Sequence, residues 1–236
     1  MPYFYFSSDY ALQWLLIIAA LIVGSVASIG VRSAYNRYSN VASSSGKTGA
    51  QAAKEILEAN GIYDIRIEPS PGAQLSDHFD PKAKVIRLSK GVYDGTSVAA
   101  LGIAAHEVGH AIQYDTEYFP IKLRNAILPV ANLGSALAFP VVILGILIGG
   151  AASELIINIG IALFLAVLAF QLITLPVEFN ASSRALTCLE SGGYVSQEEK
   201  SGSRAVLRAA AMTYVAGVIA TLFTLLRLLL IARNRD

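Results

Sequence analysis

The sequence has little charge and a single cysteine. Only 15% of its 236 residues are charged, and 18 Lys and Arg nearly balance 17 Asp and Glu, which leaves a net charge of +1. Soluble domains carry about 25% charged residues, so the composition excludes an ordinary soluble globule. The lack of positive excess argues against a nucleic-acid partner. Cys188 can form neither an internal disulfide nor a thiolate metal site alone, so any chemistry must use histidines, carboxylates and hydroxyls.

The sequence contains four long apolar runs with almost no charged residues, at 11–31, about 128–152, about 155–175 and about 209–231. A helix as long as the first run measures about 31 Å, close to the roughly 30 Å of bilayer hydrocarbon. The ten residues before it contain no Lys or Arg, so we expect an uncleaved anchor rather than a signal peptide. The residues 151–154 join the second and third runs into a tight hairpin. The sequence predicts an α-helical polytopic membrane protein with four transmembrane helices.

The positive residues orient this chain in the bilayer. The segment 32–127 holds eleven Lys and Arg and the segment 176–208 holds four, whereas residues 1–10 and 151–154 hold none. Because cytoplasmic loops carry the excess of Lys and Arg, we expect both basic segments in the cytoplasm and the N-terminus outside. The expected location is a bacterial plasma membrane.

The segment between the first two runs reads as a small α+β domain. Residues 32–46 are typical of a linker, and 47–60 have the apolar spacing of a helix that ends at Gly61. A second helix is expected over 96–114, capped by Asp94 or Thr96. Three short alternating runs bounded by turn residues predict a small antiparallel sheet between the helices: 62–68, 74–79 and 83–88.

The second helix contains the strongest motif, His106-Glu107-Val108-Gly109-His110. Two histidines four residues apart project from one helix face, so both imidazoles can bind one metal ion. Glu107 can then accept a proton from the water that attacks a substrate. The sequence therefore predicts a zinc hydrolase site on this helix.

A catalytic zinc site needs a third protein ligand. A metzincin would have Gly at 113 and His at 116, but Gln113 and Thr116 stand there, which excludes that class. The best candidate is Glu178, which we expect to start a helix directly after the third run and on the same side of the membrane as His110. It could instead only stabilise that helix N-terminus, which is worth about 0.3–1 kcal/mol. The alternative ligands are Glu117, Glu190, Glu198 and Glu199.

Three segments together resemble a known family. They are HEVGHAIQ at 106–113, FDPKAKVIRLS at 79–89 and PVEFNAS at 176–182. Over nearly its whole length the chain resembles the YugP-type membrane zinc metallopeptidases, and more distantly it is similar to the HtpX and Ste24 class of gluzincins. The resemblance implies one Zn²⁺ per chain, bound by His106, His110 and Glu178, with Glu107 as general base and acid.

The distant class has the pattern E-x-x-A-D after its hairpin, and Ser182 stands where that Asp would be. The Asp orients a ligand histidine, so another group must orient His106 or His110 here, and Asn180 is a candidate. In zincins an edge strand pairs with extended substrate; by resemblance 74–79 is the candidate strand, although it could equally be a plain sheet strand. Three residues remain unranked as oxyanion donors: Arg184, Tyr114 and His78.

The expected function is a membrane-anchored zinc endopeptidase whose partners are the lipid bilayer and a protein or peptide substrate. The alternative is a zinc-stabilised membrane scaffold with little turnover; transport is disfavoured because the apolar runs contain few ionisable residues. Two histidines and a carboxylate could also hold iron or cobalt. We expect five parts: an N-terminal transmembrane anchor (1–31), a cytoplasmic zincin-like domain with the motif helix (32–127), a transmembrane hairpin (128–175), cytoplasmic helices with the third ligand (176–208), and a C-terminal transmembrane helix and tail (209–236).

Overall fold

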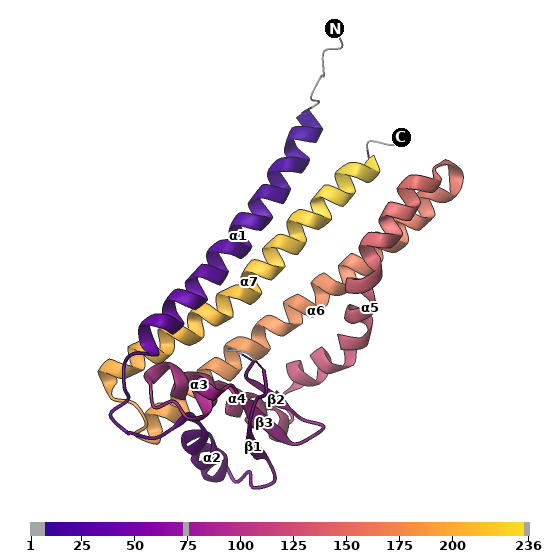
Figure 1. The fold of residues 1–236 in the computed structure, drawn as a ribbon. Helices are drawn as coiled ribbons and strands as arrows, with labels where there is room; N and C mark the ends of the chain where they lie inside the picture. Colours follow the sequence, from indigo (N-terminus) through magenta and orange to yellow (C-terminus); the bar gives the residue numbers. More distant parts are fainter. Residues whose placement is uncertain (1–7, 73–75, 234–236) are drawn as a thin grey trace. The chain divides into compact units, whose positions relative to one another are not determined.

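The structure is a computed structural model that describes residues 8–72 and 76–233. The chain divides into two compact units, one made from residues 1–27, 123–174 and 213–236, the other from residues 28–122 and 175–212. Four long helices dominate it (Figure 1): α1 (Ser8–Tyr38), α5 (Phe119–Ile148), α6 (Gly150–Ser191) and α7 (Gln197–Arg233).

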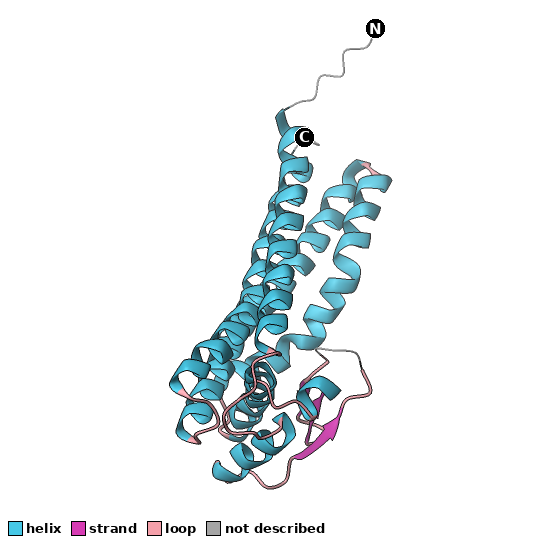
Figure 2. Cartoon of the chain, turned by 60° about the vertical axis from the view of Figure 1, so that its left-hand side comes forward, coloured by secondary structure: helices cyan, strands magenta, loops and turns pink. Residues whose placement is uncertain are grey.

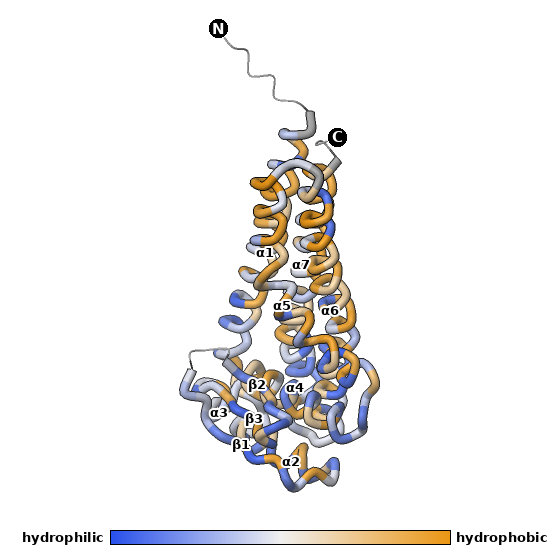
Figure 3. Tube along the Cα trace, turned by 90° about the vertical axis from the view of Figure 1, so that its right-hand side faces the viewer, coloured by the Kyte–Doolittle hydropathy of each residue, from blue (hydrophilic) through white to orange (hydrophobic). Residues whose placement is uncertain are grey.

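These four helices are long and apolar enough to cross a membrane, which confirms the four predicted spans. Orange, hydrophobic colouring follows most of their length (Figure 3). Many of their large apolar side chains are exposed, Leu21 and Leu155 each to 65% and Leu147 to 77%. A water-soluble protein rarely exposes contiguous apolar surface of this extent, whereas bilayer hydrocarbon accommodates it.

The helices begin and end differently from the prediction. Helix α1 continues to Tyr38, so the first part of the linker expected at 32–46 is helical. Helices α5 and α6 meet at Gly149 and Gly150 rather than at 151–154. Both glycines have a φ of +64°, a conformation that residues with a side chain rarely adopt, and this explains why the chain reverses there.

Small residues let α5 and α6 pack closely within the first unit. A Cβ atom on Gly134 would lie 2.7 Å from the carbonyl oxygen of Leu163, and one on Gly160 would lie 2.4 Å from a methyl group of Val142. The Ser153 hydroxyl donates a hydrogen bond of 2.7 Å to the carbonyl of Gly145, which ties the start of α6 to the end of α5. The predicted hairpin is therefore a packed helix pair.

The three strands of the described chain lie in the second unit. They are coloured magenta in Figure 2. They are β1 (Arg66–Pro69), β2 (His78–Asp80) and β3 (Val85–Leu88), in the order β1-β3-β2. Strand β2 is antiparallel to β3, but β1 is parallel to it, so the prediction of an antiparallel sheet is wrong for one of two pairs. Alternating apolar residues show which face of a strand is buried, not which way its neighbour runs. Of the strand expected at 74–79, residues 73–75 lie outside the described part of the chain.

Three helices lie wholly within this unit: α2 (Gly49–Ala59), the short α3 (Lys90–Tyr93), which was not predicted, and α4 (Val98–Asp115). Thr48 and Gln51 form a reciprocal capping box at the start of α2. The N-cap of α4 is Ser97, whose side chain accepts a hydrogen bond from the backbone of Ala100, and not Asp94 or Thr96 as expected.

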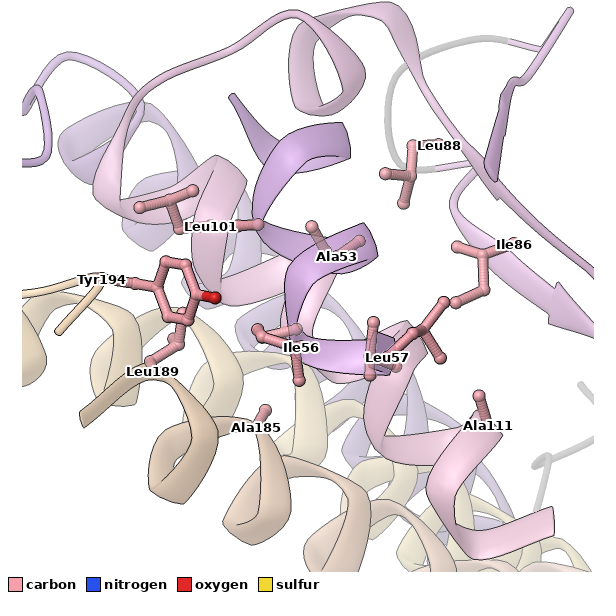
Figure 4. Close-up of a cluster of buried hydrophobic side chains, with 14 of the residues drawn as sticks. Ala53, Ile56, Leu57, Ile86, Leu88, Leu101, Ala111, Ala185, Leu189 and Tyr194 are labelled. Carbon is pink, nitrogen blue, oxygen red and sulfur yellow. The ribbon is translucent and has the colours of Figure 1, made fainter. Parts of the chain in front are cut away.

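The core of the second unit lies between α2, α4, the sheet and one segment of α6 (Figure 4). Its largest side chains are fully or almost fully buried: Ile56, Leu57, Ile86, Leu88, Leu101 and Leu189. Truncating any of them to alanine should cost about 2–5 kcal/mol of stability. This core fixes the face of α4 that carries the two histidines relative to α6.

Candidate metal centre

Helices α4 and α6 approach each other almost backbone to backbone. A Cβ atom on Gly109 would lie 2.5 Å from the carbonyl oxygen of Ala181, closer than real Cβ contacts come. Only glycine fits at this point, because any side chain would push the two helices apart. The glycine within the His-Glu-x-x-His motif therefore allows α6 to pass directly beside the histidines.

The close approach brings His106, His110 and Glu178 together. The Glu178 Oε2 atom lies 3.3 Å from His106 Nε2 and 3.6 Å from His110 Nε2. Each of the three residues offers one ligand atom, and these atoms all lie within 4.8 Å of one another. Two atoms that each bind one zinc ion at about 2.05 Å and at a tetrahedral angle are about 3.3 Å apart. The arrangement and the donor types therefore fit a zinc ion.

The other ring nitrogen of each histidine has a separate partner. His106 Nδ1 lies 3.2 Å from the hydroxyl oxygen of Ser182, and His110 Nδ1 lies 3.0 Å from the Gln113 side-chain oxygen. Partners on Nδ1 fix the ring orientation and leave Nε2 directed at the shared site. Ser182, which stands where the distantly similar class has an Asp, thus contacts one of the two candidate ligand histidines.

Asn180 is the sequence-based candidate for orienting a histidine. Its side chain contacts Gln113, and Gln113 in turn contacts His110. The side chain of Gln113 is fully buried and donates hydrogen bonds of 2.7 Å to the carbonyl of Val177 and 3.0 Å to Asn180 Oδ1. Sequence reasoning missed this role of Gln113. The signal was its position three residues after His110, which places both side chains on one face of the helix.

Two carboxylates near His110 change its pKa. Burial opposes protonation of His110, but the nearby carboxylates of Glu178 and Glu107 outweigh this effect and raise the pKa of His110 above its usual 6.5. Glu107 is itself only 8% exposed. This burial, beside a histidine of the candidate site, is the kind of position that a proton-transferring carboxylate requires.

Glu178 does not start a helix, so that part of the prediction is wrong. Helix α6 continues without a break from Gly150 to Ser191, and Pro176 lies inside it. The alternative in which Glu178 only stabilises a helix N-terminus is therefore excluded. Its side chain is 2% exposed, and its carboxylate lies beside the two imidazoles.

The alternative third ligands have other partners. Glu117 pairs with Lys122 at 2.9 Å, and Glu190 pairs with Lys200. The carboxylate of Glu198 accepts from the Ser196 hydroxyl, and that of Glu199 accepts from backbone and side chain of Ser44. In the described part of the chain, only His106, His110 and Glu178 form a group able to hold a metal.

The three candidate oxyanion donors stay unranked. Arg184 Nε donates to Asn180 Oδ1 at 2.9 Å. The Tyr114 ring packs edge-on against Phe79, with 6.0 Å between ring centroids. His78 lies in β2, where its Nδ1 is 2.9 Å from the carbonyl of Ser76.

Comparisons with known proteins identify the family of this chain. A family model described as "Putative neutral zinc metallopeptidase" matches residues 13–233. The chain is 48% identical over 219 residues to the protein named "Putative membrane protease YugP" of Bacillus subtilis (strain 168). The matched region covers 93% of this chain and 96% of that protein. No solved structure matches. With its four apolar helices the chain is a membrane protein, and by the extent of these matches it belongs to the neutral zinc metallopeptidase family.

Proposed function

We propose that the chain is a membrane-anchored, zinc-dependent endopeptidase of the gluzincin type, with one zinc ion held by His106, His110 and Glu178. The single observation that carries this proposal is the convergence of the two imidazole Nε2 atoms on Glu178 Oε2 beside the buried carboxylate of Glu107. Two neutral nitrogens and one carboxylate form the ligand set that other zinc peptidases use, and a fourth position remains for water or substrate.

Each residue has a defined role in this proposal. A zinc ion held there supplies Lewis acidity, which makes water more acidic and polarises a peptide carbonyl. Glu107 removes the proton from the attacking water and then delivers it to the leaving amine. Ser182 and Gln113 hold the two imidazole rings so that their Nε2 atoms stay directed at one point.

The proposed substrate-binding element is β2 (His78–Asp80), which overlaps the strand expected at 74–79. Strand β2 is at one edge of the sheet, so one side of its backbone faces away from β3. Its central residue, Phe79, packs against Tyr114 of α4, the helix that carries the motif. An extended peptide could therefore add to this edge beside the site by main-chain hydrogen bonds.

The proposed topology places the site on the cytoplasmic side, with the N-terminus outside. It rests on the fifteen Lys and Arg of segments 32–127 and 176–208. In this arrangement segment 32–127 acts as a zincin-like domain, and the substrates are proteins or peptides at the cytoplasmic face of the bilayer.

Replacing Glu107 with Gln tests the catalytic role. The amide keeps the size of the side chain but cannot take a proton, so we expect unchanged zinc content and a loss of cleavage of about 100-fold or more. Cleavage of unfolded proteins by the detergent-purified chain is the assay. Glu117→Gln, which alters an exposed carboxylate paired with Lys122, is the matched control and should cleave like the wild type.

Two outcomes would contradict the proposal. Cleavage by Glu107→Gln at the wild-type rate would remove its role as general base. A wild-type protein that binds zinc but cleaves no unfolded protein or peptide would favour the zinc-stabilised scaffold instead.

A further inference from the structure

We propose that Gln113 is a positioning residue that fixes the proton of His110 on Nδ1 and so leaves Nε2 free to bind metal. The proposal rests on the proposed zinc site and goes beyond it, because it assigns a function to a residue outside the proposed ligand set. Two neighbours of Gln113 have hydrogen-bonding roles that are fixed by their chemistry.

The first fixed neighbour is the backbone carbonyl of Val177. A carbonyl oxygen can only accept a hydrogen bond, and it lies 2.7 Å from the side-chain nitrogen of Gln113. If the amide were rotated by half a turn, two oxygens would face each other at that distance. The nitrogen of Gln113 therefore faces α6.

The second fixed neighbour is Arg184. Its guanidinium can only donate, and Nε lies 2.9 Å from Asn180 Oδ1, so the atom of Asn180 at that position is its oxygen. The same oxygen lies 3.0 Å from the Gln113 nitrogen and accepts from it as well. Both N–H groups of the Gln113 amide are thus used, on Val177 and on Asn180.

The remaining atom of Gln113 is its oxygen, which lies 3.0 Å from His110 Nδ1. Because an amide oxygen can only accept, His110 Nδ1 must carry the proton, and in the neutral ring Nε2 keeps its lone pair. That lone pair is on the nitrogen 3.6 Å from Glu178. A chain of hydrogen bonds from Arg184 and Val177 therefore sets which nitrogen of His110 can bind a metal.

The two histidines differ in this respect. His106 Nδ1 faces the hydroxyl of Ser182, and a hydroxyl can donate or accept, so it is compatible with either form of the ring. Gln113 is compatible with only one. The same amide also joins α4 to the turn of α6 that carries Glu178, so it orients one ligand and anchors the helix of another.

Two variants of Gln113 separate positioning from packing. Gln113→Met keeps the approximate size but removes every hydrogen bond of the side chain. Gln113→Glu keeps an acceptor for His110 Nδ1, but it loses both bonds to α6 and places a second acceptor opposite the oxygens of Val177 and Asn180. We expect zinc affinity, measured by chelator competition, to fall about 10- to 100-fold in Gln113→Met. Gln113→Glu should recover most of this loss, although it lowers thermal stability, because a carboxylate is a common partner of zinc-bound histidine.

The matched control is Gln171→Met. Gln171 lies on α6, in the first unit, and its buried side-chain oxygen has no hydrogen-bond partner among the described residues. This variant should bind zinc like the wild type. The absorption spectrum of bound Co²⁺ gives a second readout, and we expect it to change in Gln113→Met only.

Two results would overturn the proposal. In the first, Gln113→Met binds zinc within twofold of the wild type and only its thermal stability falls, which indicates a packing role. In the second, Gln113→Glu binds zinc no better than Gln113→Met, so an acceptor on His110 is not what matters. Neither result affects the peptidase proposal, which depends on loss of cleavage in Glu107→Gln with zinc retained.

Discussion

The α carbon of Gly109 faces the carbonyl oxygen of Ala181 so closely that a Cβ atom there would lie 2.5 Å from that oxygen. Gly109 belongs to the metal-binding motif, and Ala181 comes three residues after Glu178. The two helices that carry the proposed ligands can therefore come this close only because residue 109 is a glycine, which has no Cβ atom.

Gly109→Ala should impair both stability and zinc binding. The added methyl group must move backbone rather than a flexible side chain, so we expect a loss of about 1–3 kcal/mol and a weaker site as Glu178 moves away. Gly102→Ala is the matched control on the same helix. Its Cβ would make ordinary contact at 3.5 Å with the side chain of Ser203, so thermal unfolding and zinc affinity should stay near the wild type. Equal zinc affinity in the two variants would contradict this role for Gly109.

Glu178→Ala should release the metal from the site. A ligand should matter more than its outer partners, whose loss costs about 10- to 100-fold in affinity, so we expect a decrease of more than about 100-fold. Metal content per chain, measured by atomic emission after dialysis, checks this. Glu190→Ala removes an exposed carboxylate of the same helix that pairs with Lys200, and it should retain the metal. A full equivalent of zinc in Glu178→Ala would mean that another residue completes the site.

Some of this site could be predicted from sequence because its signals are local. The four apolar runs are visible as composition, and His106 and His110 share a helix face by spacing alone. Glu178 had to be inferred from topology, because nothing local joins it to His110. The prediction that Glu178 starts a new helix was wrong because of Pro176. Proline usually breaks the helix of a soluble protein, whereas α6 continues through it, as helices of membrane proteins can.

Other features could not be predicted because they depend on side-chain direction or on strand pairing. A buried glutamine has two donors and an acceptor, and only the positions of Val177 and Asn180 show how Gln113 uses them. In the same way, β1 and β2 have similar short alternating sequences, yet one is parallel to β3 and the other antiparallel.

Ser182 variants test how much the partner of His106 contributes. Ser182→Ala removes the hydroxyl that lies 3.2 Å from His106 Nδ1 and should weaken zinc binding about 10-fold. Ser182→Asp places a carboxylate there, as in the more distantly similar class, and should bind zinc at least as tightly as the wild type because it makes the imidazole more basic. Chelator competition measures both. Tighter binding by Ser182→Ala than by Ser182→Asp would contradict this assignment.

The pH dependence of stability should have opposite signs with and without metal. In the metal-free protein the pKa of His110 is raised above its unfolded value of 6.5, against the effect of burial, by Glu178 and Glu107. A raised pKa in the folded state contributes stability that is fully present below pH 6.5 and is lost as pH rises through the folded pKa. Zinc must displace this proton, so the affinity for zinc rises with pH, by about tenfold per pH unit for each proton released.

Thermal unfolding between pH 6 and 8, in chelator and in excess zinc, measures how stability changes with pH in both states. The melting temperature should fall with pH in chelator and rise with pH in zinc, whereas a common slope under both conditions would mean that zinc does not compete with the proton on His110.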